Sequence, residues 1–189
     1  MPRSPAVRII DSGCGTGYYL SRVLSERADA SALALDASPA AVSMAVTNSS
    51  ARSTGLVADV WSPLPVRSGI ADAVLCVFAP RNASEFARVL VPEGRLLVVT
   101  PRENHLQELR ASGAMIGIQP DKLGALDDAL AAEFGLGHRE ALEYTIDLDV
   151  DDQLLAAAMG PSGHHERTVV PVDSQVVTVA VDLSVYTVR

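Results

Sequence analysis

The stretch VRIIDSGCGTG, residues 7–17, decides the fold of this chain. A short apolar run ends in an acid and passes into glycines at alternating positions, Gly13, Gly15 and Gly17. The run predicts a buried strand, and the glycines predict a tight turn in which a ligand can approach the backbone amides. Apolar residues at helical spacing follow over 18–27. The stretch therefore predicts a strand–loop–helix unit with a ligand at the loop.

Strand-like and helix-like segments alternate over the first hundred residues. Ser38 followed by Pro39 is a favourable helix start, because Ser caps a helix and Pro fits its first turn. Repeated strand–helix alternation is typical of a parallel sheet with right-handed crossovers. The predicted elements are four further strands at 31–36, 55–59, 71–78 and 95–100, and helices from Ser38 onward and over 84–90.

The last ninety residues have a different pattern. The predicted elements there are helices near 121–134 and over 151–159, and strands over 141–150 and 175–188. A turn is expected at 91–94, before the fifth strand. We therefore predict an α/β fold with a mostly parallel, seven-stranded sheet, a C-terminal antiparallel hairpin, and one domain over residues 1–189.

The 189 residues carry a net charge of −8, which is unevenly spread. Residues 1–102 hold ten Lys or Arg against eight Asp or Glu, whereas 103–189 hold five against fifteen. Because nucleic-acid affinity comes largely from Lys and Arg, any RNA contact is expected from the first half. No apolar run reaches the ~18 residues of a membrane span, and two cysteines are too few for a four-thiolate zinc site. We expect no membrane contact, no metal and a cytoplasmic location.

The glycine spacing separates two classes of nucleotide ligand. A dinucleotide fingerprint, G-x-G-x-x-G/A counted from Gly13, needs a small residue at the place of Tyr18. The pattern D-x-G-x-G-x-G of residues 11–17 instead resembles motif I of Rossmann-like S-adenosylmethionine (AdoMet) methyltransferases. The spacing therefore favours AdoMet as the cofactor over NAD or FAD.

Three acids are predicted at the ends of adjacent strands. Asp11 ends the first strand, Asp36 the second and Asp59 the third, and ligands of open α/β sheets bind at such carboxyl ends. Asp36, with Ala37 beside it, is expected to accept hydrogen bonds from ribose hydroxyls, and Asp59 one from the adenine amino group. For each acid taken singly, a solvated strand end or a helix cap is as good an explanation as a ligand contact. The three together with the glycines favour a ligand site.

Several segments together resemble the 23S rRNA (guanine-N1)-methyltransferase family. They are residues 11–19 (DSGCGTGYY), 33–36 (LALD), 64–65 before Asp72, 78–80 (FAP), 87–89 (ARV), and Thr100 and Pro101 followed by His105 and Leu106. Residues 159–162 (MGPS) before His164 and His165 are similar to the branch associated with resistance to tylosin-type macrolides. The resemblance implies a Rossmann-like fold and transfer of the AdoMet methyl group to N1 of a guanine in a 23S rRNA hairpin loop.

The resemblance also implies which residues form the site. By the family pattern, Gly15 and Thr16 contact AdoMet, and His105 is the matching cofactor-site position. Phe78 and Pro80 stand where many base-modifying methyltransferases hold a flipped target base, and stacking on Phe78 suits such a base. Phe78 is equally well explained as a core aromatic at a strand end.

Substrate recognition and assembly are left open by the sequence. Members of the family normally begin with a cysteine-rich zinc module that helps recognise RNA, and no CxxC pattern occurs in this chain. RNA binding is therefore expected to need such an N-terminal module, and a homodimer is a further expectation. Two alternatives remain: a small-molecule (natural-product) methyltransferase, which the acidic second half suits, and a truncated AdoMet-binding protein without activity.

Overall fold

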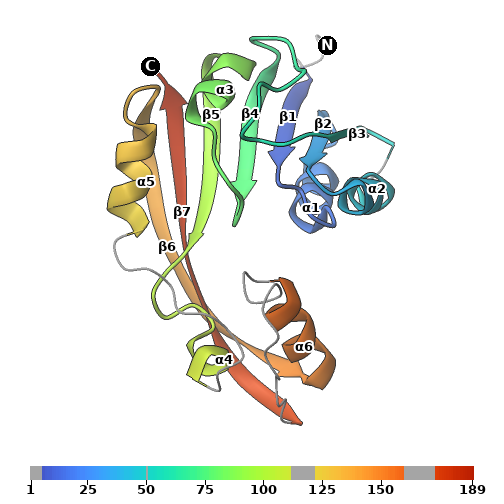
Figure 1. Cartoon of the computed structure of the whole chain (residues 1–189), viewed down its shortest axis with the longest axis vertical. Helices are drawn as coiled ribbons and strands as arrows, with labels where there is room; N and C mark the ends of the chain where they lie inside the picture. Colours follow the sequence, from blue (N-terminus) through green and yellow to red (C-terminus); the bar gives the residue numbers. More distant parts are fainter. Residues whose placement is uncertain (1–5, 50, 112–121, 160–172) are drawn as a thin grey trace. The chain divides into compact units, whose positions relative to one another are not determined.

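A computed structural model describes residues 6–49, 51–111, 122–159 and 173–189 (Figure 1). The described chain divides into two compact units, one holding the residues up to Val99 with 125–139 and 184–189, the other holding 100–124 and 140–183. Residues 160–165, which carry part of the family resemblance, lie outside the described residues. The expectation of one domain over 1–189 stays a prediction.

The sheet has seven strands in the order β3-β2-β1-β4-β5-β7-β6. β1 pairs in parallel with both β2 and β4, β2 with β3, and β4 with β5. The elements of this part are β1 (Val7–Ser12), α1 (Tyr18–Glu26), β2 (Ala30–Asp36), α2 (Pro39–Asn48), β3 (Ser53–Val57), β4 (Ala71–Val77), α3 (Ala83–Val89) and β5 (Leu90–Pro101). The predicted parallel sheet is confirmed.

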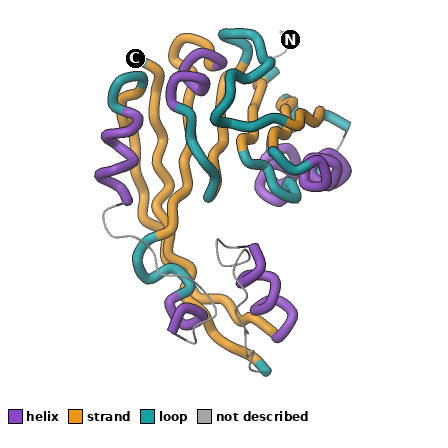
Figure 2. The backbone as a smooth tube through the Cα atoms, in the orientation of Figure 1, coloured by secondary structure: helices purple, strands orange, loops and turns teal. Residues whose placement is uncertain are grey.

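The remainder of the described chain adds an antiparallel pair to the sheet, as predicted. Figure 2 shows its two members as long strands side by side. The elements are α4 (Gln107–Ala111), α5 (Lys122–Leu130), β6 (Phe134–Asp149), α6 (Val150–Met159) and β7 (Ser174–Val188). The helix α4 was not predicted, and α5 ends before Phe134, which begins a strand instead.

Two local predictions are wrong. β3 ends at Val57, so Asp59 lies in the following loop and not at a strand end. The turn predicted at 91–94 is a bulge inside β5: Leu90 pairs with Ala71 while Arg95 already pairs with Ala73, and Glu93 has a φ of 63°. Pairing with β4 on both sides of the bulge keeps these residues within the strand despite their turn-forming sequence.

Alternate residues of the central strands enter two different cores. Ile9 lies with Leu20 and Leu24 of α1 and with Val42 and Ala45 of α2. The next residue in the strand, Ile10, belongs to the opposite core, which also contains Val74, Phe86, Val89, Leu96, Leu126, Leu130 and Phe134. Helices therefore pack on both faces of the parallel strands, which explains why those strands are almost continuously apolar. Among the described residues, no helix combines the length and the apolarity that a membrane crossing needs.

Candidate functional site

The glycine loop between β1 and α1 is closed by backbone hydrogen bonds. The amides of Gly13 and Cys14 both donate to the carbonyl oxygen of Leu35, at 2.8 and 3.0 Å, and the Gly17 amide donates to that of Cys14 at 2.9 Å. Gly13, Gly15 and Gly17 have φ values of 75°, 50° and 78°. Only glycine adopts such left-handed conformations at little cost, so the alternating pattern fixes the path of the loop.

The three glycines serve different purposes. A Cβ atom on Gly13 would lie 2.4 Å from the Cβ of Ala79, and one on Gly17 would lie 2.6 Å from the Cα of Ala45 in α2. Both positions therefore allow close packing within the protein. A Cβ on Gly15 would have nothing within 4 Å. Gly15 is thus the point where the loop backbone is left open to a ligand.

Asp36, the last residue of β2, is fixed by two amides. One carboxylate oxygen accepts a hydrogen bond from the Gly15 amide at 3.0 Å, and the other accepts one from the Ser38 amide at 2.9 Å. The side chain is half-buried, and Ala37 beside it is exposed. A carboxylate has about four lone-pair positions, so two remain for hydroxyl donors of a ligand. Its place at the carboxyl end of β2 confirms the predicted position.

Asp11, near the end of β1, is a buried carboxyl group with 3 % of its surface exposed. Burial and, secondarily, the negative charge of Asp36 raise the pKa of Asp11 to about 7. The two carboxyl groups are therefore close enough to interact electrostatically, and they make the volume beside the glycine loop electronegative. This volume repels an anionic pyrophosphate and suits a cationic group, because a nearby positive charge stabilises both carboxylates.

Asp59 forms a turn in the loop that follows β3. Its Oδ1 accepts a hydrogen bond from the Trp61 amide at 3.0 Å, and its carbonyl oxygen accepts one from the Ser62 amide at 3.1 Å. Both Asp59 and Trp61 are exposed, Trp61 at 66 %. The contact of Asp59 with adenine stays a prediction. Asp59 would make it from the loop after β3 and not from a strand end.

The segment after β4 holds an aromatic side chain in solvent. Phe78 has a φ of 53°, which is costly for a bulky residue, and 48 % of its surface is exposed. The Cys76 thiol donates to the carbonyl oxygens of Ala79 and Pro80 at 3.4 and 3.5 Å. Burial raises the pKa of Cys76 to about 12, so it remains a thiol donor. Ala79 also lies against Gly13, so this segment is beside the glycine loop. The alternative prediction, that Phe78 is a core aromatic, is wrong because the side chain is exposed.

His105 belongs to the second compact unit. It lies in a turn after β5, where its amide donates to the Arg102 carbonyl oxygen at 3.0 Å. Its Nδ1 accepts a hydrogen bond from the Ala180 amide of β7 at 3.2 Å, which fixes the imidazole orientation. Contact of His105 with a cofactor stays a prediction.

Sequence reasoning missed two asparagines that hold the loops of the first unit. Asn48 at the end of α2 donates to the Thr16 carbonyl oxygen at 3.0 Å, while Thr16 itself is exposed. Asn82 caps α3 and donates to the Val60 carbonyl oxygen at 2.9 Å. An Asn three residues before Glu85 is a recognisable helix start, but nothing near Asn48 in the sequence indicates its partner.

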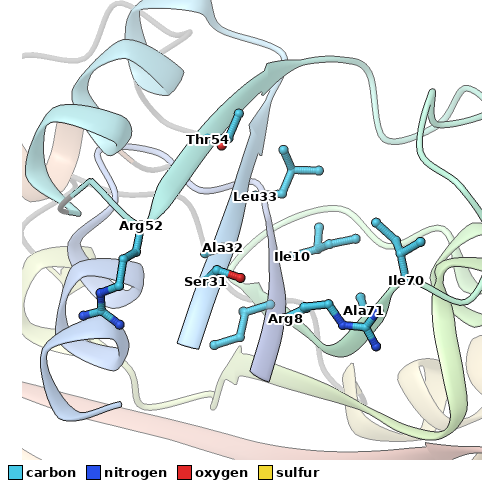
Figure 3. Close-up of a pocket in the computed structure, with 10 residues that line it drawn as sticks. Arg8, Ile10, Ser31, Ala32, Leu33, Arg52, Thr54, Ile70 and Ala71 are labelled. Atoms are coloured by element: carbon cyan, nitrogen blue, oxygen red, sulfur yellow. The ribbon is translucent and has the colours of Figure 1, made fainter. Parts of the chain in front are cut away.

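Two other features do not contribute to this site. A hollow of about 260 Å³ lies over the first residues of β1, β2 and β4 (Figure 3), at the opposite ends of these strands from Asp11 and Asp36. Its arginines are bound within the protein, Arg8 to Asp72 and Arg52 to backbone carbonyl groups. Among the described residues, no group of three or more potential metal ligands occurs.

Comparison with known proteins agrees with this geometry. Residues 9–94 match the family model of the methyltransferase domain. The 23S rRNA (guanine(748)-N(1))-methyltransferase of Streptomyces fradiae is 44% identical over 158 residues, which cover 84% of this chain and 56% of that protein. A Micromonospora griseorubida protein assigned a 23S rRNA (guanine-N(1)-)-methyltransferase activity is 36% identical over 157 residues, covering 83% of this chain and 53% of the relative. The chain thus spans about half the length of these curated relatives.

Solved structures extend the agreement to the fold. A structure concerning the conversion of a disulfide bond into a thioacetal group in echinomycin biosynthesis has a TM-score of 0.65 at 16% identity, with 97% of this chain and 76% of that chain covered. The tRNA (m1A58) methyltransferase of Aquifex aeolicus has a TM-score of 0.59 at 15% identity. The match covers 97% of this chain and 62% of that chain. The fold is that of the Rossmann-like AdoMet methyltransferases. Residues 9–94 of the chain are therefore similar to a methyltransferase domain, and most of the chain is similar to about half the length of two curated 23S rRNA (guanine-N1)-methyltransferases.

Proposed function

We propose that this chain transfers a methyl group from AdoMet to N1 of a guanine in a hairpin loop of 23S rRNA. The observation that carries the cofactor assignment is the pair of carboxyl groups, Asp11 and Asp36, beside an open glycine loop. AdoMet carries positive charge on its sulfonium and its amino group, which this pair stabilises. The choice of guanine N1 rests on the 44% identical relative from Streptomyces fradiae.

The residues that would hold AdoMet fit its chemistry. Asp36 has lone pairs left for the proposed bonds to the ribose hydroxyls, and a side chain on Gly15 would meet no atom within 4 Å, so its backbone is open to the ligand. The first turn of α1 starts at Gly17 with no acidic side chain, so its amides suit the ligand carboxylate. Asp59 with Trp61 remains the proposed neighbour of adenine, and His105 a proposed cofactor contact.

When bound, AdoMet supplies a methyl group that an acceptor nitrogen can displace in line. The chain must place the acceptor against that group and exclude water. Phe78 offers an exposed ring for stacking a flipped guanine, and Pro80 borders it on the same strained turn. The Cys76 thiol holds this turn in place through the carbonyl oxygens of Ala79 and Pro80.

We propose that full RNA recognition needs a module outside this domain. Residues 103–189 carry five basic against fifteen acidic side chains, so they contribute no attraction for phosphates. An rRNA substrate places the activity in the cytoplasm, and methylation of a macrolide-binding region would confer resistance. A homodimer is a further proposal, which sedimentation velocity of the purified chain tests.

The function is tested in two steps. Isothermal titration calorimetry with AdoMet is expected to show one site per chain. Tritiated methyl transfer from AdoMet to a 23S rRNA hairpin, followed by reverse transcription, is expected to give a stop at one guanine, because an N1 methyl group blocks base pairing. Because full RNA recognition is proposed to need a further module, the transfer assay is repeated with the N-terminal part of the Streptomyces fradiae relative fused to the chain. Binding of AdoMet without any transfer to RNA by this fusion would contradict the substrate assignment.

Phe78 provides a sharper test of the acceptor site. Phe78→Leu removes the aromatic face and is expected to lower kcat/KM for the hairpin about tenfold while AdoMet affinity stays unchanged, since base stacking contributes roughly 1–3 kcal/mol. Phe78→Tyr keeps the ring and serves as the matched control. Equal loss in both variants would remove Phe78 from the acceptor site.

A small-molecule methyltransferase is the second candidate, and the acidic second half favours it. An acidic surface repels RNA but accepts cationic natural products. Transfer to small heterocycles that exceeds transfer to the hairpin under the same conditions would select this function.

A further inference from the structure

The connection between β3 and β4 is long but firmly packed. Residues 58–70 contain neither helix nor strand, and loops of this length are uncommon unless they have a function. Val60 and Leu64 are nevertheless buried, with 8 % and 5 % of their surfaces exposed, and Val60 belongs to the core beneath α3. The loop that carries Asp59 and Trp61 is therefore held in one place.

Side chains of α3 and its cap hold the backbone of this loop. Asn82 Nδ2 donates to the Val60 carbonyl oxygen at 2.9 Å. Glu85 Oε2 accepts from the Leu64 amide at 2.7 Å, and Arg88 Nη2 donates to the Leu64 carbonyl oxygen at 3.0 Å. The three holding residues are spaced by three positions, which places them along one side of the helix.

Glu85 and Arg88 form a rigid anchor at Leu64. Arg88 Nε and Nη2 donate to the two carboxylate oxygens of Glu85 at 2.8 and 2.7 Å. The hydrogen bonds from Arg88 lower the pKa of Glu85, so its carboxylate is charged at neutral pH. Both backbone groups of Leu64 are thus satisfied at one point. Of the three holding residues, Asn82 follows the proposed acceptor segment most closely in sequence.

Asn82 uses both ends of its amide group. Its Oδ1 accepts from the Glu85 amide at 3.3 Å and from Ser84 Oγ at 3.1 Å, which caps α3. Its Nδ2 donates to Val60. Asp caps a helix as well as Asn does, but a carboxylate has no proton to donate. Capping suits Asn and Asp equally, so the bond to the loop is the feature of this position that requires Asn rather than Asp.

The bond joins two segments of the proposed site. Val60 lies between Asp59 and Trp61, the proposed neighbours of adenine. Asn82 follows Pro80 by two residues, in the segment proposed to hold the target base. We propose that Asn82 is a positioning residue that couples the cofactor loop to the acceptor segment, so that both adopt the reactive geometry together. This inference rests on the proposed methyltransferase function.

Trp61, the only tryptophan of the chain, reports on this loop directly. Asn82→Asp and Asn82→Ser keep the helix cap but lose the amide donor. Both are expected to unfold within a few degrees of the wild type, to increase acrylamide quenching of Trp61 at least 1.5-fold, and to weaken AdoMet binding five- to thirtyfold. Ser84→Ala removes one bond to the cap oxygen and keeps the donor, so it is the matched control with wild-type quenching and affinity.

The outcomes separate this inference from the function on which it rests. Wild-type quenching of Trp61, or wild-type AdoMet affinity, in both Asn82 variants would overturn the coupling. Failure of the wild-type chain to bind AdoMet would instead contradict the proposed function. Quenching of Trp61 in the ligand-free variants would still decide whether Asn82 holds the loop.

Discussion

The two loops that border the proposed cofactor site are held by different means. The glycine loop is closed by backbone groups: the Gly13 and Cys14 amides donate to Leu35 of β2, the Gly17 amide donates to Cys14, and the glycines have positive φ. The β3–β4 loop has little regular structure of its own and depends on side chains from α3, about twenty residues further along the chain. The path of one loop is therefore set mainly by backbone groups and glycine conformation, and that of the other by side chains of a helix.

This difference has consequences for mutation. A change in the glycine loop acts on backbone conformation and close packing, so it is expected to cost stability as well as ligand affinity. A change in the α3 side chains releases a loop whose ends remain in the sheet, so it is expected to affect ligand geometry more than folding. The predictions below test this contrast, beginning with the largest effect.

Gly17→Ala is expected to give the largest loss of stability. The new methyl group would lie 2.6 Å from the Ala45 Cα, and the φ of 78° disfavours any side chain. Overpacking and left-handed strain together cost roughly 2–6 kcal/mol in the free energy of unfolding. Gly15→Ala, with no atom within 4 Å, is the control and is expected to lose about 1–2 kcal/mol. Urea unfolding measures both, and equal losses would remove the distinction between packing and ligand glycines.

Asp11→Asn is expected to make the protein more stable at alkaline pH. The raised pKa of Asp11, about 7, means that the folded state loses stability as pH rises from the unfolded value near 3.8 through 7. The neutral amide avoids this loss, so the variant should gain roughly 2–4 kcal/mol over the wild type at pH 8 and much less at pH 5. Urea unfolding at the two pH values measures this, and a gain independent of pH would exclude burial of a charge as its cause.

Asp36→Ala is expected to weaken AdoMet binding ten- to a hundredfold. It removes the acceptor of the Gly15 and Ser38 amides as well as the proposed ribose contact. Asp36→Asn keeps one acceptor oxygen and should lose less affinity. Calorimetry with AdoMet compares the two, and unchanged affinity in Asp36→Ala would contradict the ribose assignment.

Arg88→Lys is expected to give the smallest effect on folding. Lys keeps the charge beside Glu85 but cannot form the two parallel hydrogen bonds of the guanidinium group, which reach Glu85 at 2.8 and 2.7 Å. A loss of about 1 kcal/mol in stability is expected, together with increased acrylamide quenching of Trp61. A larger stability loss than that of Gly17→Ala would reverse the proposed contrast between the two loops.

The part of the site that could be predicted from sequence is the part that the backbone specifies. Alternating glycines after an apolar run predicted the loop, and the end of the second strand placed Asp36 correctly. Asp59 was misplaced because β3 is short and its end has no sequence marker. The prediction that Phe78 is a core aromatic was wrong. Hydrophobicity alone does not reveal that the backbone takes a positive φ after β4 and that the ring is left exposed.

The sequence by itself determined the order of strands and helices as far as β5, the glycine loop, and the places of Asp11 and Asp36, because these follow from apolar periodicity and from the conformational freedom of glycine. Only the tertiary structure decided that the charge of Asp36 acts on the buried carboxyl group of Asp11, and that Asn82, Glu85 and Arg88 hold the loop of Val60 and Leu64. The physical reason is that such hydrogen bonds and charge effects act over a few ångströms in space, between residues that no local pattern connects.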